Sequence, residues 1–252
     1  MPKARVHPFH FTLLLGLLAQ TAGGQIFSVR QPRLRDQWTF GGNFIAGIPV
    51  GEFRQNENGA GGGQLTFGFQ PFRREPLVLR AQVGTLMYGT ASAYGYQDVC
   101  DATGCWTEQV RYNARSHTMS SIHAGPELMA TDGKYRPFGY ALAGYTFFNS
   151  WANLLPTTPT GTTSTQSLFS SHNFSTSYGG GLRRVGKTFG RESGLELAFD
   201  VTRNANARYL TEAGLSRQTD GTWIISPRSG AANVLGIHLG FWVGPYINWN
   251  ER

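Results

Sequence analysis

Three residues of one short segment carry the side chains of a nucleophile, a general base and an acid. Ser121, His123 and Glu127 all lie within SSIHAGPEL. A serine activated by a histidine that a carboxylate orients is the arrangement of many acyl-transfer enzymes. On one extended strand, however, Ser121 and Glu127 would lie about 20 Å apart, at about 3.3 Å per residue. The spacing excludes a triad from this strand alone, so we expect no catalytic residue.

Metal and nucleotide chemistry find equally little support. The two cysteines, Cys100 and Cys105 in VCDATGCW, have no histidine beside them and make a poor zinc site. An even number of cysteines in an exported chain instead predicts a disulfide, here closing a small loop around Thr103 and Gly104. The glycine run 179–181 is not followed by the Lys-Ser/Thr pair of a phosphate loop. We therefore expect no metal and no cofactor, and read the glycines as close backbone packing in a strand.

The N-terminal residues indicate that the chain is exported. Lys3 and Arg5 precede an apolar stretch from Phe9 to Ala19, and small residues follow as far as Gly24. This pattern predicts a signal peptide over residues 1–24, cleaved after Ala22 or Gly24; a buried N-terminal helix is the alternative. No stretch has the roughly 20 apolar residues that a transmembrane helix needs. An exported membrane protein of this sequence would have to span as a closed barrel.

The composition fits that expectation. Charged residues make up 15% of the chain and aromatic residues 13%, there are 33 glycines, and the mean hydropathy is −0.27. Few charges, many aromatics and no long apolar run are typical of barrels in which apolar residues alternate with small polar ones. The net charge of +7 is carried by scattered arginines with no basic run longer than a pair. This distribution argues against a nucleic-acid partner and favours arginines at a lipopolysaccharide surface or in a lumen.

Eight segments alternate between apolar and small or polar residues with the period of two that predicts a strand. They cover about 37–50, 64–70, 77–89, 110–129, 138–148, 174–185, 195–202 and 235–243. In the fifth, the pattern places Tyr140, Leu142 and Phe148 outward. Long connections, at about 51–62, 91–109, 149–173 and 203–231, alternate with short turns. This rhythm predicts an all-β, closed antiparallel transmembrane barrel over residues 37–244, with long external loops and short periplasmic turns. A periplasmic segment would precede it at 25–36, and a periplasmic tail would follow at 245–252.

The same alternation predicts what fills the lumen and what borders the membrane. Eight strands enclose little more than their own side chains, and buried charges must be paired. We expect a lumen charge network made of Arg80, Arg111, Arg115, Arg183, Glu127, Glu196 and Asp200. A narrow water path is the alternative. Interfacial aromatic residues would form a periplasmic girdle of Trp38, Phe72, Tyr135, Phe189 and Trp242. An opposite girdle would comprise Tyr94, Trp106, Phe148, Trp151, Phe174 and Trp223.

The chain resembles the outer-membrane protein β-barrel domain family, the small OmpA/OmpX-like barrels. The resemblance covers about Trp38 to Val243 and lies in FGGNFIAGIPVGEF, RPFGYALAGYTFF, ELAFDVTRNANARYL and LGIHLGF. It implies a C-terminal assembly signal at Gly236, Leu239 and Phe241, read by the barrel-insertion machinery. The chain departs from the pattern by continuing through WVGPYINWNER. These motifs predict an architecture, which by itself implies no function.

Three functions remain open at this point. The first is a structural or surface-interaction barrel of the bacterial outer membrane that acts through its external loops, because loops on rigid scaffolds carry function. Its partners would be outer-membrane lipids, lipopolysaccharide and an unknown surface ligand. The second is a narrow pore for ions or small solutes, and the third is a lipid-modifying barrel enzyme.

Overall fold

A computed structural model describes residues 37–72, 75–101, 103–154, 164–188, 191–217 and 223–246. For 91–99, 101, 108–115, 153–154, 164, 217, 223 and 245–246 it describes the backbone only. The predicted signal peptide, the segment 25–36 and the tail from residue 247 lie outside the described residues. None of the helices in the described part is both long and apolar enough to cross a bilayer.

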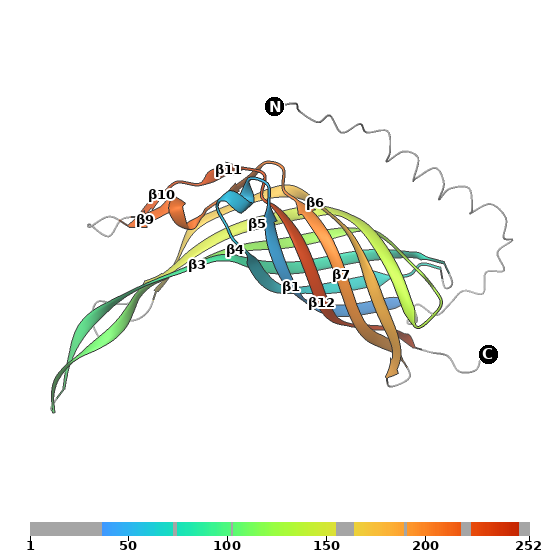
Figure 1. The fold of residues 1–252 in the computed structure, drawn as a ribbon, viewed down its shortest axis with the longest axis horizontal. Helices are drawn as coiled ribbons and strands as arrows, with labels where there is room; N and C mark the ends of the chain where they lie inside the picture. Colours follow the sequence, from blue (N-terminus) through green and yellow to red (C-terminus); the bar gives the residue numbers. More distant parts are fainter. Residues whose placement is uncertain are drawn as a thin grey trace. The chain divides into compact units, whose positions relative to one another are not determined.

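Eight antiparallel strands close into a barrel (Figure 1), which confirms the predicted fold and the resemblance at the level of architecture. The closing contact joins the first strand to the last, and its register runs from Phe40 opposite Val243 to Val50 opposite Asn233. The strands are β1 (Trp38–Val50), β2 (Ala60–Phe69), β3 (Leu77–Asp101), β4 (Gly104–Met129), β5 (Tyr135–Leu154), β6 (Ser164–Thr188), β7 (Arg191–Arg203) and β12 (Asn233–Tyr246).

The two ends of the barrel differ in their connections. The end where β1 begins and β12 finishes carries the turn 130–134 and residues 70–72 and 75–76 between β2 and β3. Thr188, the last residue of β6, and Arg191, the first of β7, also lie there, and we call this end the short-turn end. The opposite, long-loop end carries 51–59 with the short helix η2 (Phe53–Gln55), and there β5 ends at Leu154 and β6 begins at Ser164. It also carries residues 204–217 and 223–232, with β8 (Ala207–Tyr209), η3 (Glu212–Gly214), β9 (Leu215–Arg217), β10 (Trp223–Ile225) and β11 (Arg228–Gly230).

Two of the predicted long loops are largely strand. Residues 91–101 continue β3 and residues 104–109 belong to β4, so the two strands form one ladder that ends at Asp101 opposite Gly104. Residues 149–154 extend β5, and β6 begins at Ser164. The sequence analysis predicted loops here because these residues are polar. A two-stranded ladder needs no apolar face when it runs beyond the barrel, because its backbone hydrogen bonds form whichever side chains it carries.

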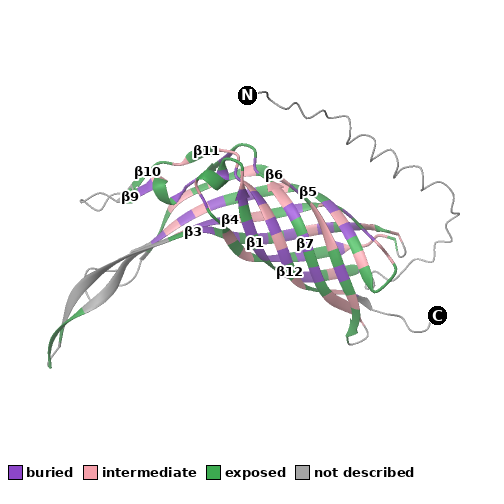
Figure 2. Cartoon of the chain, in the orientation of Figure 1, coloured by how far each residue is buried: buried purple, intermediate pink, exposed green. Residues whose placement is uncertain are grey.

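Buried and exposed residues alternate along the strands of the barrel wall (Figure 2). The exposed face carries large apolar side chains, whereas the buried face carries both polar and apolar ones. Phe44 is 82% exposed, and Leu65, Val83, Leu197 and Leu239 also face outward, as predicted. On β5 the predicted parity is wrong: Tyr140, Leu142 and Phe148 are buried, whereas Tyr145 and Phe147 face outward. Both faces of this strand are aromatic, so its own alternation is ambiguous. Pairing with β4 decides the direction by placing Tyr140 opposite the buried Glu127.

The short-turn girdle is present in part. Trp38, Phe72 and Tyr135 are more than half exposed, as an interfacial position requires, whereas Phe189 lies outside the described residues. The predicted interfacial position of Trp242 is wrong, because its side chain is 3% exposed and points into the barrel. Its register partners are Gly41 and Gly194, which leave space for the indole.

At the long-loop end, Phe174 and Trp106 are exposed and Trp151 is half-buried. Phe148 is fully buried and belongs to the lumen instead of the second girdle. The side chains of Tyr94 and Trp223 lie outside the described residues.

Candidate functional site

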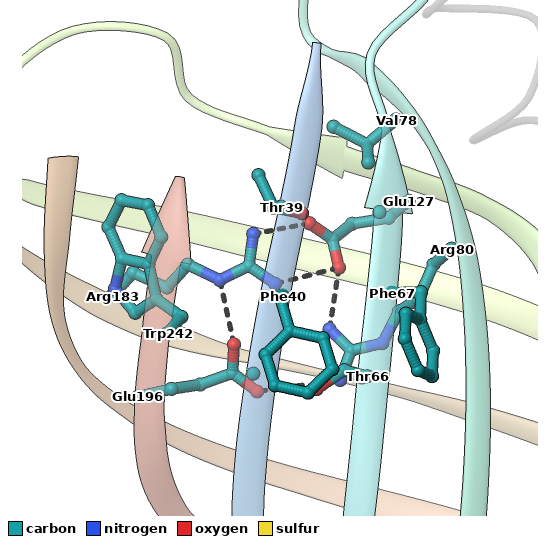
Figure 3. A pocket seen from close by; sticks show the side chains of 12 residues that line it. Thr39, Phe40, Thr66, Phe67, Val78, Arg80, Glu127, Arg183, Glu196 and Trp242 are labelled. Carbon is teal, nitrogen blue, oxygen red and sulfur yellow. Dashed lines mark hydrogen bonds and ion pairs between the residues drawn. The ribbon is translucent and has the colours of Figure 1, made fainter. Parts of the chain in front are cut away.

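Two arginines and two glutamates meet inside the barrel near the short-turn end (Figure 3). The carboxylate of Glu127 accepts from Arg80 Nη1 at 2.6 Å and from Arg183 Nη1 at 2.7 Å. Glu196 accepts from Arg183 Nε at 2.7 Å and from Arg80 Nη2 at 3.4 Å. Each of the four side chains comes from a different strand, so the network exists only when β3, β4, β6 and β7 are in register.

Aromatic faces enclose the two guanidinium groups. The Cζ atom of Arg80 lies 4.5 Å from the centre of the Tyr140 ring, and that of Arg183 lies 4.4 Å from the centre of the Phe138 ring. The ring centre of Trp242 lies 5.8 Å from Arg183 Cζ, so the inward-pointing indole contacts this guanidinium group. A cation over an aromatic face is attracted by the ring quadrupole, and the attraction is stronger when water is absent.

The network is buried and its charges balance. All four side chains are at least 94% buried, and their two positive and two negative formal charges cancel. The cavity that they line together with Thr39, Thr66 and Val78 measures about 10 Å³, which is about the space of one water molecule. The described lumen is therefore filled at this level.

Asp200 belongs to a separate cluster, which corrects its predicted place beside the arginines. It accepts from Ser177 Oγ at 2.9 Å and contacts His238 Nε2 at 2.9 Å. Gly179 and Gly236 flank it, and a Cβ atom at either would clash with the Asp200 side chain. The contacts with Ser177 and His238 hold the Asp200 carboxylate inside the lumen.

Arg111 and Arg115 stay predictions as members of the charge network. Their side chains lie outside the described residues, but the backbone places Arg111 where β4 pairs with β3 alone, beyond the last residue paired with β5. Arg115 stands twelve residues from Glu127 along β4, or about 40 Å at 3.3 Å per residue.

The serine, histidine and carboxylate of β4 do not form a triad. His123 Nε2 bonds to Ser175 Oγ at 2.7 Å, and Ser175 accepts from Thr146 Oγ1 at 2.8 Å. Glu127 is held by the two arginines. His123 and Glu127 therefore belong to two different lumen clusters, and among the described residues no nucleophile–base–acid chain links Ser121 to Glu127.

A second cluster, rich in aromatic side chains, is buried at the long-loop end of the barrel. Phe53, from the loop between β1 and β2, is fully buried, and its ring centre lies 5.3 Å from that of Tyr88 and 5.0 Å from that of Tyr209. Phe148 and Leu210 are buried in the same mouth, and Tyr88 donates to the Leu210 carbonyl at 3.1 Å. We call Phe53, Tyr88, Phe148, Tyr209 and Leu210 the mouth cluster. The sequence analysis did not predict this cluster. The signal that could have indicated it is the isolated phenylalanine in the polar stretch GEFRQNENG.

The β3–β4 ladder projects beyond its neighbours (Figure 1). From Tyr94 to Asp101 and from Gly104 to Arg111 the two strands pair with each other alone among the described residues, and we call this part the arm. Cys100 and Cys105 face each other across it and form the predicted disulfide. The arm therefore has two edges whose backbone groups are available to a partner.

The solved structures that this chain resembles share little sequence with it. No family model and no curated protein sequence matches the chain. Among solved structures, Ail, the attachment invasion locus protein of Yersinia pestis in complex with the heparin analogue sucrose octasulfate, shares 8% identity at a TM-score of 0.40, over 84% of this chain and 99% of Ail. Neisserial surface protein A shares 10% sequence identity at a TM-score of 0.39, over 83% of this chain and 97% of that protein. The outer membrane protein OprG from Pseudomonas aeruginosa shares 9% sequence identity at a TM-score of 0.38, over 86% of this chain and 99% of OprG. Similarity at this level concerns the fold alone.

Proposed function

We propose that the chain is an outer-membrane β-barrel that works through surface contacts at its long-loop end and does not conduct through its lumen. The observation that carries the membrane assignment is the reversed wall, with large apolar side chains such as Phe44, Phe174 and Leu239 outside and ionised groups inside. Soluble proteins rarely expose so continuous an apolar surface. The short-turn end would face the periplasm, as in other bacterial outer-membrane barrels.

The two clusters support a role outside the lumen. The charge network blocks one end and the mouth cluster the other, so the surfaces left for recognition are the long loops and the arm. The assembly signal at Gly236, Leu239 and Phe241 stays a prediction; Leu239 and Phe241 face outward, where such a signal would be read. We propose no catalytic role.

Removal of the arm tests the surface role. Replacing residues 94–112 by Asn-Gly, which favours a tight hairpin, should leave the heat-modifiable band of the folded barrel in outer-membrane fractions unchanged. Adhesion of expressing cells to glycan- and protein-coated surfaces should fall about tenfold relative to wild type. A Glu75→Ala variant, altered at the short-turn end, serves as the control. Equal adhesion by arm-deleted, wild-type and non-expressing cells would contradict a surface role.

Conductance distinguishes the closed barrel from the pore. In planar bilayers, the purified protein should show no steady channel, because about one water molecule fits beside the charge network. A barrel of 16–18 strands, which encloses an aqueous channel, provides the positive control. Stable openings of the unaltered protein would replace our proposal by the narrow pore.

A further inference from the structure

We infer that the loop 51–59 and residues 204–217 and 223–232 of the connection before β12 form a latch over the barrel mouth that is docked in acid and released near neutral pH, with Glu57 as its sensing group. This device goes beyond the proposed function and does not depend on it.

Contacts between the two loops build the latch. Phe53 inserts between Tyr88 of the wall and Tyr209 of the connection. Asn56 bonds to the Tyr209 side chain, and Glu52 Oε2 accepts the backbone N–H of Ala231 at 3.1 Å. Neither loop contributes a barrel strand, so both can leave the mouth while the eight-stranded wall remains closed.

Glu57 is a buried acid within this latch. It is 7% exposed, and its Oε1 has no hydrogen-bond partner in the described part of the chain. A Cβ atom at Gly89 would lie 3.4 Å from Glu57 Oε2 and 2.9 Å from the His117 ring, so the missing side chain at position 89 leaves the space in which the carboxyl sits. An ionised carboxylate would lose its hydration there without an adequate replacement.

Charged and titratable groups surround Glu57. Glu212 of η3 faces it from the connection, Tyr88 from β3, His117 from β4 and Tyr209 from β8. Burial first, and the charge of Glu212 second, raise the pKa of Glu57 from 4.5 to about 7. Once released into water, the carboxyl returns to its ordinary pKa.

The direction of the pH effect follows from this difference. The docked form binds the proton more tightly than the released form, so docking is fully favoured below pH 4.5 and weakens as the pH rises to about 7. The ratio of released to docked loops changes up to about tenfold per pH unit inside this window and is constant above it. Across the window of about 2.5 pH units, release becomes about three hundredfold more favourable.

Hydrogen exchange of the whole protein in detergent micelles tests the latch. The amides of Gln55, Asn56 and Glu57 bond to carbonyls within the loop and report its docking. After correction for the intrinsic pH dependence of exchange, their protection should fall by at least about tenfold between pH 4.5 and pH 7.5, while amides of β7 stay protected.

Three variants test whether ionisation of Glu57 causes the change in protection. Glu57→Gln, which cannot ionise, should stay protected across the range. Glu212→Gln should keep the transition but move its midpoint to lower pH, and it also serves if Glu57→Gln fails to fold. Glu75→Gln, at the other end of the barrel, should behave as wild type. Protection that does not change with pH in the wild type, or a transition that persists in Glu57→Gln, would overturn the inference.

Discussion

Glu127→Ala should destabilise the barrel by about 3–5 kcal/mol, the range for removing one partner of a buried charge pair. Glu127 is 1% exposed and bonds to both Arg80 and Arg183, so its loss leaves two buried guanidinium groups with Glu196 alone. Urea unfolding in lipid vesicles measures the change. Glu196→Ala removes a carboxylate from the same two arginines and should act in the same direction.

Two controls separate the charge effect from lost packing. Glu192→Ala breaks the partly exposed pair with Arg136 and should cost about 0–1 kcal/mol. The double variant Arg80→Met, Glu127→Leu removes one charge of each sign and should regain most of the stability that Glu127→Ala loses, because apolar residues of similar volume replace a buried pair at little cost. If Glu127→Ala and Glu192→Ala had equal effects, the network would not be a main contributor to stability.

Gly179→Val should cost about 1–3 kcal/mol or more and reduce the yield of folded barrel, although valine is a good strand former. A Cβ atom at this position would lie 2.2 Å from the Phe199 carbonyl oxygen and 2.6 Å from Asp200 Cβ. The strands must separate or Asp200 must move, and the latter disturbs its contacts with Ser177 and His238. The unfolding midpoint and the fraction of heat-modifiable protein after refolding measure the result.

Gly61→Val is the matched control. Gly61 also lies in a barrel strand, but a Cβ atom there would have no heavy atom within 4 Å. The change should stay within about 0.5 kcal/mol, as for most surface positions. Comparable losses from the two substitutions would show that flexibility of the glycine matters at position 179, and not close approach.

Alternation along the chain predicted much of this protein. The outward faces of β1, β3 and β7 follow from apolar residues at every second position, because successive side chains of a strand point to opposite sides. The same parity placed Arg80, Glu127, Arg183 and Glu196 inside, where an eight-stranded lumen has room for little except their mutual contacts. The spacing of Cys100 and Cys105 indicated their disulfide.

Tertiary structure decided what parity leaves open. Trp242 turns inward because the neighbouring strands carry Gly41 and Gly194 opposite it, and β5 presents Tyr140 to the lumen because β4 places Glu127 beside it. Asp200 pairs with His238 across strands whose register no single segment specifies. The mouth cluster joins Phe53 to Tyr209, which are 156 residues apart in sequence. Local periodicity fixes the face of a strand, whereas register and loop docking depend on contacts that exist only after the barrel has closed.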